Sequence, residues 1–299
     1  MFDIETAHAL WRYSHIAIGS IGLIAFWLPI FAKKGSRLHI RAGKVFVCCG
    51  YYVVFTALVS CVWGLSAPLS FLESLGMSAQ RAVATAAELQ FLYAILGFLA
   101  MSVLVGLRMG VRVIQTRKTP EKLATPALKL LHIVYGASGA GLLIFGLWQM
   151  PAHGVGSRYL ICVILGTVGV FEFRESMRFL ANPRPTRMAW WYMHMESMLG
   201  CGIGFHTAFL VFGFSRMIPA NWMPGPLVLL PWLLPTAVGV PATSLWIRYY
   251  KRKFGELDED DAKGVREVES RHIASTDQPA NTPSSMNESQ RSDIDFGSS

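Results

Sequence analysis

Four histidines within long apolar stretches are the residues of this sequence most able to do chemistry. They are His15, His132, His194 and His206. Ionisable groups at membrane depth are costly and mark functional sites by default. A neutral imidazole is a good axial ligand of haem iron, and two imidazoles from different helices hold one haem in the core of a helix bundle. We therefore take these four histidines as candidate cofactor ligands.

The expected depth of each histidine arranges the four into two pairs. His15 lies about four residues from the outer end of the first apolar stretch, and His206 about seven from the outer end of the sixth. At about 1.5 Å per residue, both occupy the outer half of a membrane. His132 and His194 each lie about four residues from an inner end. This pattern predicts haem b bound by two axial pairs, His15 with His206 and His132 with His194.

The spacing of the two histidines in the sixth stretch has two opposing consequences. His194 and His206 are 12 residues apart, a rise of about 18 Å that suits two stacked redox centres in transmembrane electron transfer. At about 100° per residue, however, the two side chains point some 120° apart around the helix. They face one partner helix only if this helix is bent or overwound.

A local repeat leads to a hypothesis from another class of protein. His-Ile with glycines four and seven positions after the histidine occurs at His15 and again at His132. These positions share one helix face, where the glycines let another backbone or a flat cofactor approach closely. The two stretches run in opposite directions, as an inverted repeat of three helices would leave them. The alternative function is therefore a transporter or proton-coupled carrier.

Three prolines in the last apolar stretch fit the same alternative. Pro231, Pro235 and Pro241 each remove one intrahelical hydrogen bond. We expect a kinked or broken helix, and such helices line sites in transporters.

The carboxylates of the apolar stretches are expected to be mainly structural. Glu172 and Glu175 flank Arg174 near an inner end, where they can be solvated or paired. Glu88 and Glu196 lie further in, and interfacial solvation is the expectation, with a proton relay as the alternative.

The elements that position these residues are long apolar helices. A span of a bilayer needs about 20 mainly apolar residues and must be helical, because lipid offers backbone groups no partner. Seven stretches meet this requirement: about 11–31, 45–65, 85–107, 128–149, 157–173, 190–213 and 226–247. The predicted fold is an all-α integral membrane bundle of about seven transmembrane helices.

The basic residues predict the orientation of this bundle. Of the 23 Lys and Arg residues in 1–253, 19 follow the first, third, fifth and seventh spans, and four lie on the opposite side. The positive-inside rule then places the N-terminus outside and the C-terminus in the cytoplasm. We expect a multi-pass protein of the cell inner membrane, with the lipid bilayer as its main partner.

A composition change near residue 254 predicts two domains. The membrane domain, 1–253, carries a net charge of +15, whereas the tail, 254–299, carries −7. The tail has few large apolar residues, so we expect it to be disordered and cytoplasmic, with binding of a partner protein as an alternative. The basic loops are explained by topology and anionic lipid, so nucleic-acid binding is not expected. A third hypothesis is a non-catalytic membrane component whose tail recruits partners.

Short motifs resemble those of a known family. They are Arg37-Leu38-His39 with Gly43, His194 with Met198 and the run 207–211, and Trp232 with Pro235 and Gly239. Across most of 10–247 the chain resembles the bacterial multi-pass membrane protein family of unknown function numbered 2306. This resemblance implies a topology and no established activity. A looser similarity is to bundle-type b cytochromes, although these usually pair ligands on adjacent helices.

Overall fold

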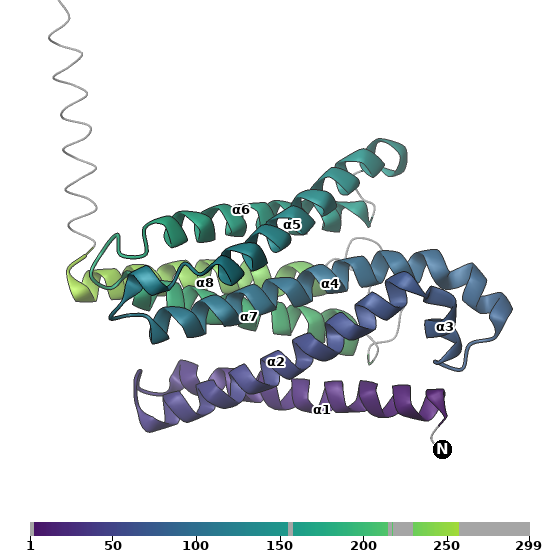
Figure 1. The fold of residues 1–299 in the computed structure, drawn as a ribbon, viewed down its shortest axis with the longest axis horizontal. Helices are drawn as coiled ribbons and strands as arrows, with labels where there is room; N and C mark the ends of the chain where they lie inside the picture. The colour runs from purple at the N-terminus through teal and green to yellow at the C-terminus, as the bar shows by residue number, and fades with distance from the viewer. Residues whose placement is uncertain (1–2, 155–157, 215–216, 218–229, 257–299) are drawn as a thin grey trace, which may run out of the picture. The chain divides into compact units, whose positions relative to one another are not determined.

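The computed structural model describes residues 3–154, 158–214, 217 and 230–256, and their regular structure is entirely helical. The helices, in chain order, are α1 (Ile4–Phe31), α2 (Arg37–Ser66), α3 (Pro68–Glu73), α4 (Ala79–Gln115), η1 (Pro120–Lys122), α5 (Pro126–His153), α6 (Tyr159–Ala181), α7 (Ala189–Ala208), η2 (Phe209–Gly213) and α8 (Leu230–Phe254) (Figure 1). The chain divides into two compact units, Met1–Tyr250 and Lys251–Ser299. The expected disordered tail lies outside the described residues from 257 onward.

Six helices in the described part of the chain are long and apolar enough to cross a membrane by length and composition. They are α1, α2, α4, α5, α7 with η2, and α8. The sequence predicts seven spans, and the expected span at 157–173 corresponds to α6, which is not among the six. The last ten residues of α6 include Glu172, Arg174 and Glu175, which fall in every 18-residue segment of this helix, whereas each of the six has an apolar segment of that length with at most two charged residues.

Polar caps make α1 and α5 begin before their apolar stretches do. The Asp3 carboxylate accepts a hydrogen bond from the Thr6 backbone N–H at 2.6 Å, and the Thr125 hydroxyl accepts one from that of Leu128 at 3.3 Å. Such caps satisfy donors that have no partner within the helix. Hydrogen bonding to the side chain and backbone of Thr6 lowers the pKa of Asp3 below its ordinary value.

Lys34 stabilises the turn between α1 and α2. Its ammonium group donates to the carbonyl oxygens of Pro29 and Ile30, both at 2.8 Å. It also lies 4.8 Å from the centroid of the Trp246 ring on α8, within cation–π range. Burial in this position lowers the pKa of the Lys34 amino group. The Lys34 side chain thus provides a hydrogen-bond donor for two carbonyl groups at the end of α1 and also contacts α8.

The last helix is continuous, so of the expected kink or break the break is wrong, and the kink stays a prediction. Pro235 and Pro241 lie inside α8, which runs without interruption from Leu230 to Phe254. Each proline removes one backbone hydrogen bond, and the bonds of the neighbouring residues maintain the helix. No residue of α8 is buried, so this helix contacts the rest of its unit only lightly.

Helices α1, α2, α4 and α7 share one hydrophobic core. Its buried members are Ala25, Phe26, Phe46, Val54, Val103, Leu107, Cys201 and Phe205. Glycine allows the helices to meet there, because a Cβ added to Gly202 on α7 would lie 2.0 Å from Cε2 of Phe26 on α1. Aromatic side chains of one helix therefore fill the space left by the missing side chains of another.

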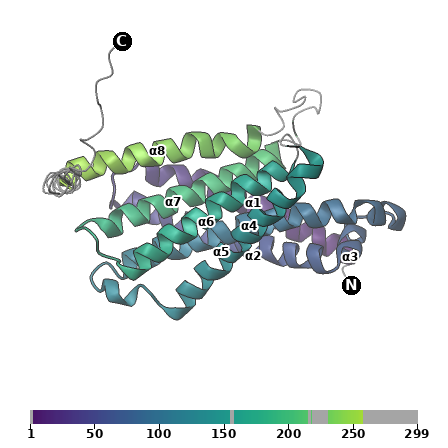
Figure 2. The ribbon, with the colours of Figure 1, turned by 90° about the horizontal axis from the view of Figure 1, so that it is seen from above.

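Helices α5 and α6 form an antiparallel pair in direct backbone contact. A Cβ added to Gly166 would lie 2.5 Å from Leu143 N and 2.7 Å from Gly139 O. A Cβ added to Gly146 would lie 2.9 Å from the Tyr159 carbonyl oxygen. Figures 1 and 2 both show the two helices side by side along their length. Since backbone atoms cannot rotate away, these positions require glycine.

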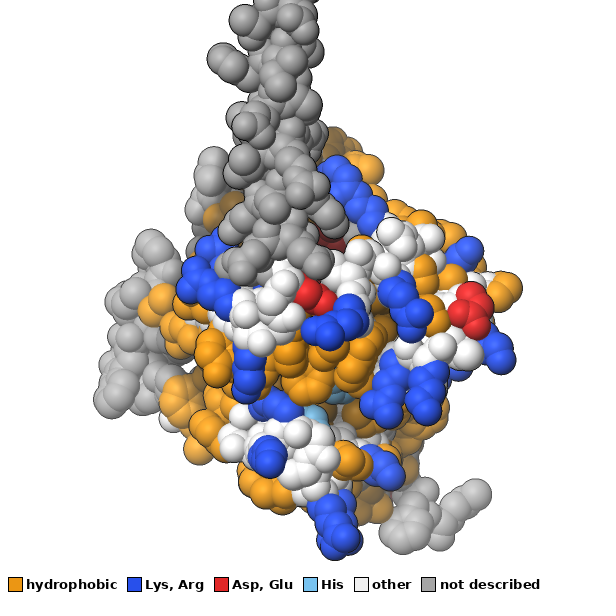
Figure 3. All heavy atoms as spheres, turned by 90° about the vertical axis from the view of Figure 1, so that its left-hand side faces the viewer, with side chains coloured by type: hydrophobic (Ala, Val, Ile, Leu, Met, Phe, Trp, Pro, Cys, Tyr) orange, Lys and Arg blue, Asp and Glu red, His pale blue; other side chains and the backbone are white. Residues whose placement is uncertain are grey.

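The basic loops meet at one end of the helix bundle. Arg184, in the loop before α7, donates a hydrogen bond to the carbonyl oxygen of Arg117, in the loop after α4, at 3.2 Å. The contact of Lys34 with Trp246 places the first basic loop near the end of α8. Figure 3 shows Lys and Arg side chains gathered on this end. We refer to it as the basic end of the bundle.

We expect Gly166→Ala to lower the free energy of unfolding by about 1–3 kcal/mol, because the added methyl group forces α5 and α6 apart. Gly141→Ala on α5 is the matched control, since nothing lies within 4 Å of a Cβ at Gly141. This control should leave stability unchanged or raise it by up to about 1 kcal/mol. Denaturation of the purified protein in detergent micelles, followed by circular dichroism, measures both. Equal effects of the two substitutions would contradict the close approach of the helices.

Candidate functional site

The structure does not bring His15 and His206 together. His15 Nδ1 lies 2.6 Å from the Thr56 hydroxyl on α2. His206 accepts a hydrogen bond at Nε2 from the Trp27 indole at 3.1 Å and donates one from Nδ1 to the Gly202 carbonyl oxygen at 2.7 Å. Trp27 is 12 residues beyond His15 on α1, a rise of about 18 Å. His206 therefore contacts α1 about 18 Å along the helix from His15.

His132 and His194 lie at a similar level of the bundle, but each bonds to a backbone carbonyl. Nδ1 of His132 lies 2.8 Å from the oxygen of Leu128, and Nδ1 of His194 lies 2.9 Å from the oxygen of Gly110 on α4. His132 is 0% exposed, and its Nε2 has no hydrogen-bond partner. A buried acceptor without a partner costs about 1–3 kcal/mol. We have no structural account of this lone pair.

The surroundings of His132 and of the glycines in the two repeats are closely packed. The side chain of His132 is enclosed on all sides, so there is no room for a porphyrin at its free nitrogen. The glycines of the two repeats face neighbouring helices, since a Cβ at Gly136 would lie 2.4 Å from Phe173 and one at Gly22 would lie 3.1 Å from Phe205. The described residues contain no cluster of three or more metal-ligating side chains. The haem assignment stays a prediction of the sequence.

The repeated glycines have the same role in both copies of the repeat. On α1, Gly22 contacts Cys49 of the following helix, at 3.2 Å from an added Cβ. On α5, Gly139 contacts Gly169 of its following helix, at 3.3 Å. In each copy the glycine face therefore carries a close contact with the next long helix.

Four helices instead converge on a buried tyrosine and a glutamate. Tyr135 on α5, which is 1% exposed, donates its hydroxyl to Glu172 Oε2 on α6 at 2.5 Å. The side chain of Ser102 on α4 interacts with both groups. Phe98 stacks on the Tyr135 ring, with centroids 5.2 Å apart and an interplanar angle of 20°. The site is about 14 Å along each of α5 and α6 from the basic end.

A second carboxyl group, from α7, belongs to the same site. Glu196 is within electrostatic range of Glu172 and also of Glu175. Cys201, one turn further along α7, also interacts with Glu172 and donates a hydrogen bond from Sγ to the Val103 carbonyl oxygen at 3.5 Å. We refer to Ser102, Tyr135, Glu172 and Glu196 as the carboxyl cluster.

The two glutamates and the start of the next turn of α7 are exposed. Glu172 nevertheless has its hydrogen-bond partner, Tyr135, on α5. Gly200, one turn after Glu196, has nothing within 4 Å of an added Cβ. The carboxyl cluster therefore lies at the border of the helix contacts and is not sealed inside them.

The other carboxylates are paired at the ends of helices. Glu88 forms an ion pair with Arg158. Glu175 forms one with Arg178 at 2.8 Å. The expected solvation or pairing thus applies to Glu88 and Glu175, whereas Glu172 lies within the bundle.

Sequence reasoning missed Tyr135 and Ser102 and assigned Glu172 to the surface. One signal was present: Gly169 and Glu172 are three residues apart and so lie near each other on the helix surface. That surface is the one by which α6 contacts α5.

We expect purified protein from haem-sufficient cells to show no b-type signal in a reduced-minus-oxidised absorption spectrum. The reason is geometric. His206 contacts α1 at Trp27, about 18 Å along the helix from His15, and both ring nitrogens of His206 are already hydrogen-bonded. A b-type band that disappears in both His15→Ala and His206→Ala would show that the pair does bind haem.

We expect Tyr135→Phe to lower the free energy of unfolding by about 1–3 kcal/mol, because the Glu172 carboxyl group loses its buried donor. Tyr52→Phe is the matched control, since that hydroxyl bonds Ser14 in an exposed position. Its effect should stay within about 0.5 kcal/mol. Combining Tyr135→Phe with Glu172→Gln should cost less than the sum of the two single changes. Additive costs would mean that the two side chains do not interact.

Comparisons with protein families, curated proteins and solved structures found no match to this chain. The resemblance to the family of unknown function numbered 2306 stays a prediction of the sequence.

Proposed function

We propose that this chain is a multi-pass protein of the inner membrane and works as a proton-coupled carrier. Six helices in the described residues have the length and composition of membrane spans. A helix bundle of this kind has to bury or pair its polar groups, because hydrocarbon offers them no partner. The polar groups that remain inside are therefore the first candidates for function.

In this proposal α6 is a seventh span. Its 23 residues match the length of a span, and its backbone contact with α5 holds it antiparallel to a helix that is itself a span. The gathering of Lys and Arg at the basic end supports a cytoplasmic location for this end, with the N-terminus outside and the tail inside (Figure 3).

The carboxyl cluster is the single observation that carries the proposed activity. Two carboxyl groups, Glu172 and Glu196, lie near each other among four long helices. Two like charges in one site repel each other, and a proton bound by either carboxyl group removes that repulsion. Chains of carboxylates within membrane helices are typical of proton relays in pumps and transporters.

The residues around the carboxyl groups have distinct roles in this proposal. Glu172 and Glu196 bind and release the proton. Tyr135 positions Glu172 through its hydroxyl and, being 1% exposed, is itself out of contact with water. The open side of α7 at Gly200 gives a solute access to the carboxyl groups.

The carrier is favoured over electron transfer because the four candidate haem ligands are separated, whereas the polar groups of the carboxyl cluster lie together. The four histidines bond Thr56, Trp27 and backbone carbonyls, which separates them. The glycine faces at His15 and His132 contact the following helices in the same way, which supports the inverted repeat from which the carrier hypothesis arose.

We expect protein reconstituted in liposomes on a solid-supported membrane to give a transient charge displacement after a pH jump. Glu172→Gln and Glu196→Gln should each reduce the displaced charge at least severalfold, because each removes one proton-binding group. Glu73→Gln, an exposed position on α3, is the control and should behave as the parent protein does. The experiment requires no knowledge of the transported solute.

Stability and activity can be separated in the same samples. The variants should keep the circular dichroism and elution profile of the parent protein, since glutamine retains the size of glutamate. A displaced charge that is unchanged in the Glu172→Gln, Glu196→Gln double variant would overturn the proposal.

A further inference from the structure

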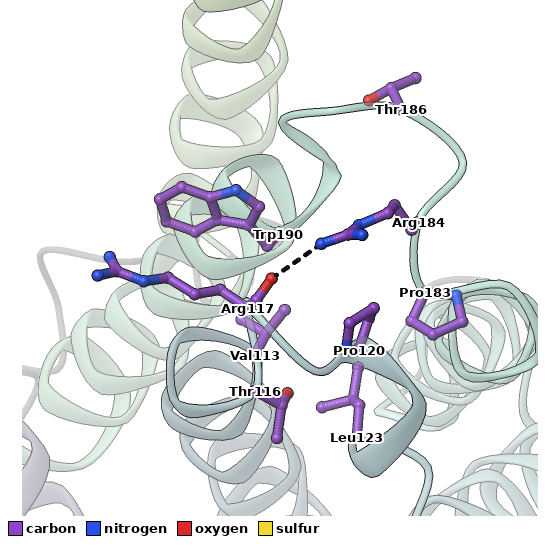
Figure 4. Close-up of a pocket in the computed structure, with 9 residues that line it drawn as sticks. All are labelled: Val113, Thr116, Arg117, Pro120, Leu123, Pro183, Arg184, Thr186 and Trp190. Atoms are coloured by element: carbon purple, nitrogen blue, oxygen red, sulfur yellow. Dashed lines mark hydrogen bonds between the residues drawn. The ribbon is translucent and has the colours of Figure 1, made fainter.

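A small hollow lies at the basic end of the bundle, among the end of α4, the turn η1, the loop after α6 and the first turn of α7. Pro120, Leu123 and Pro183 form its apolar part, and Arg117, Arg184 and Trp190 lie around it. Figure 4 shows Pro120 and Pro183 on facing loops with Leu123 beneath them. The hollow has no part in the carboxyl cluster, which is further along the bundle.

Arg184 holds the two loops of this hollow together. Its Nη2 donates to the Arg117 carbonyl oxygen at 3.2 Å, as the dashed line in Figure 4 marks. A guanidinium group has five N–H donors in a fixed planar arrangement, so donors remain after this single bond. The Arg117 guanidinium lies 5.6 Å from the Trp190 ring centroid, in a cation–π contact. The fork of Arg184 is thus fixed in position at the edge of an apolar hollow.

The charge around the hollow is strongly positive. The end of α4 and the residues after it, 112–122, carry four Lys and Arg residues and one acid, Glu121. The loop before α7, 182–188, carries two more Arg residues, which makes six basic residues in all. Helix α7 also begins here with no side chain capping its N-terminus. Its first turn adds partial positive charge to the same place.

We propose that this hollow binds the phosphate of an anionic phospholipid. Arginine binds phosphate through paired N–H groups, and its planar fork matches two phosphate oxygens. The hollow is at the ends of membrane helices and beside Trp190, where an aromatic ring lies at headgroup level. Basic pockets between helices on the cytoplasmic side are typical sites for anionic headgroups.

This inference rests on the membrane location of the chain and not on proton coupling. A failure of the lipid site therefore leaves the carrier proposal unaffected, and the reverse is also true. The two are tested with different variants and different readouts.

The test is native mass spectrometry of the full-length protein in detergent, titrated with phosphatidylglycerol or with phosphatidylcholine of the same acyl chains. We expect the parent protein to bind phosphatidylglycerol at least about tenfold more tightly than phosphatidylcholine. Arg184→Gln should remove about tenfold of that affinity, because a hydrogen bond to a charged group is lost together with its charge. Arg184→Lys keeps the charge without the fork and should give an intermediate loss.

Arg41→Gln is the matched control. Arg41 is an exposed cation in the second turn of α2, away from the hollow, and its removal should reduce affinity by no more than the few-fold effect of one diffuse charge. Equal losses for Arg41→Gln and Arg184→Gln would overturn the site in favour of general surface attraction. Displacement of phosphatidylglycerol by millimolar inorganic phosphate would overturn the lipid assignment in favour of a free anion. Arg184→Lys tests the site if the glutamine variant fails to fold.

Discussion

The close approach of α5 and α6 through glycine is the constraint on which the rest of this structure depends. In hydrocarbon, helices have no hydrophobic force driving them together, so they associate through tight packing and polar contacts. Gly139, Gly166 and Gly169 supply that packing, and the register they fix also places Tyr135 opposite Glu172. Larger residues at these positions would separate the helices and take the hydroxyl away from the carboxyl group. The glycines of α5 and α6 therefore determine where along these two helices the hydrogen bond between Tyr135 and Glu172 forms.

Much of the helical fold could be predicted from the sequence, because the length of an apolar run is a local property. Six of the seven expected spans correspond to helices of membrane-spanning length and composition. Helix ends were less predictable, since Asp3 and Thr125 extend α1 and α5 beyond their apolar residues through caps. The count of spans differs at α6 because Glu172, Arg174 and Glu175 lie within the helix itself. A hydropathy pattern cannot tell whether such charges face lipid, water or other helices.

The candidate site was less predictable, for a physical reason that the histidines illustrate. Depth was counted from the ends of apolar stretches, which assumes that all helices share the same ends and no tilt. Instead, His206 contacts Trp27, far along α1 from His15. Which side chains meet across two helices depends on how far one helix is shifted along the other. The sequence of a single helix does not determine this shift. Glu172 was misplaced for the related reason that its neighbour Arg174 made it resemble a surface residue. The neighbouring Gly169, three residues before Glu172, was the better guide, because glycines that meet another helix mark contact between helices.

The hydrogen bond between Trp27 and His206 links a mechanical contact to a chemical state. The indole can only donate, so the bond exists only while Nε2 of His206 keeps its lone pair. Nδ1 already carries a hydrogen, which it gives to Gly202. The tautomer with its hydrogen on Nδ1 is therefore the one that lets α1 and α7 meet at this level, so the bond inside α7 and the contact between the two helices form one arrangement.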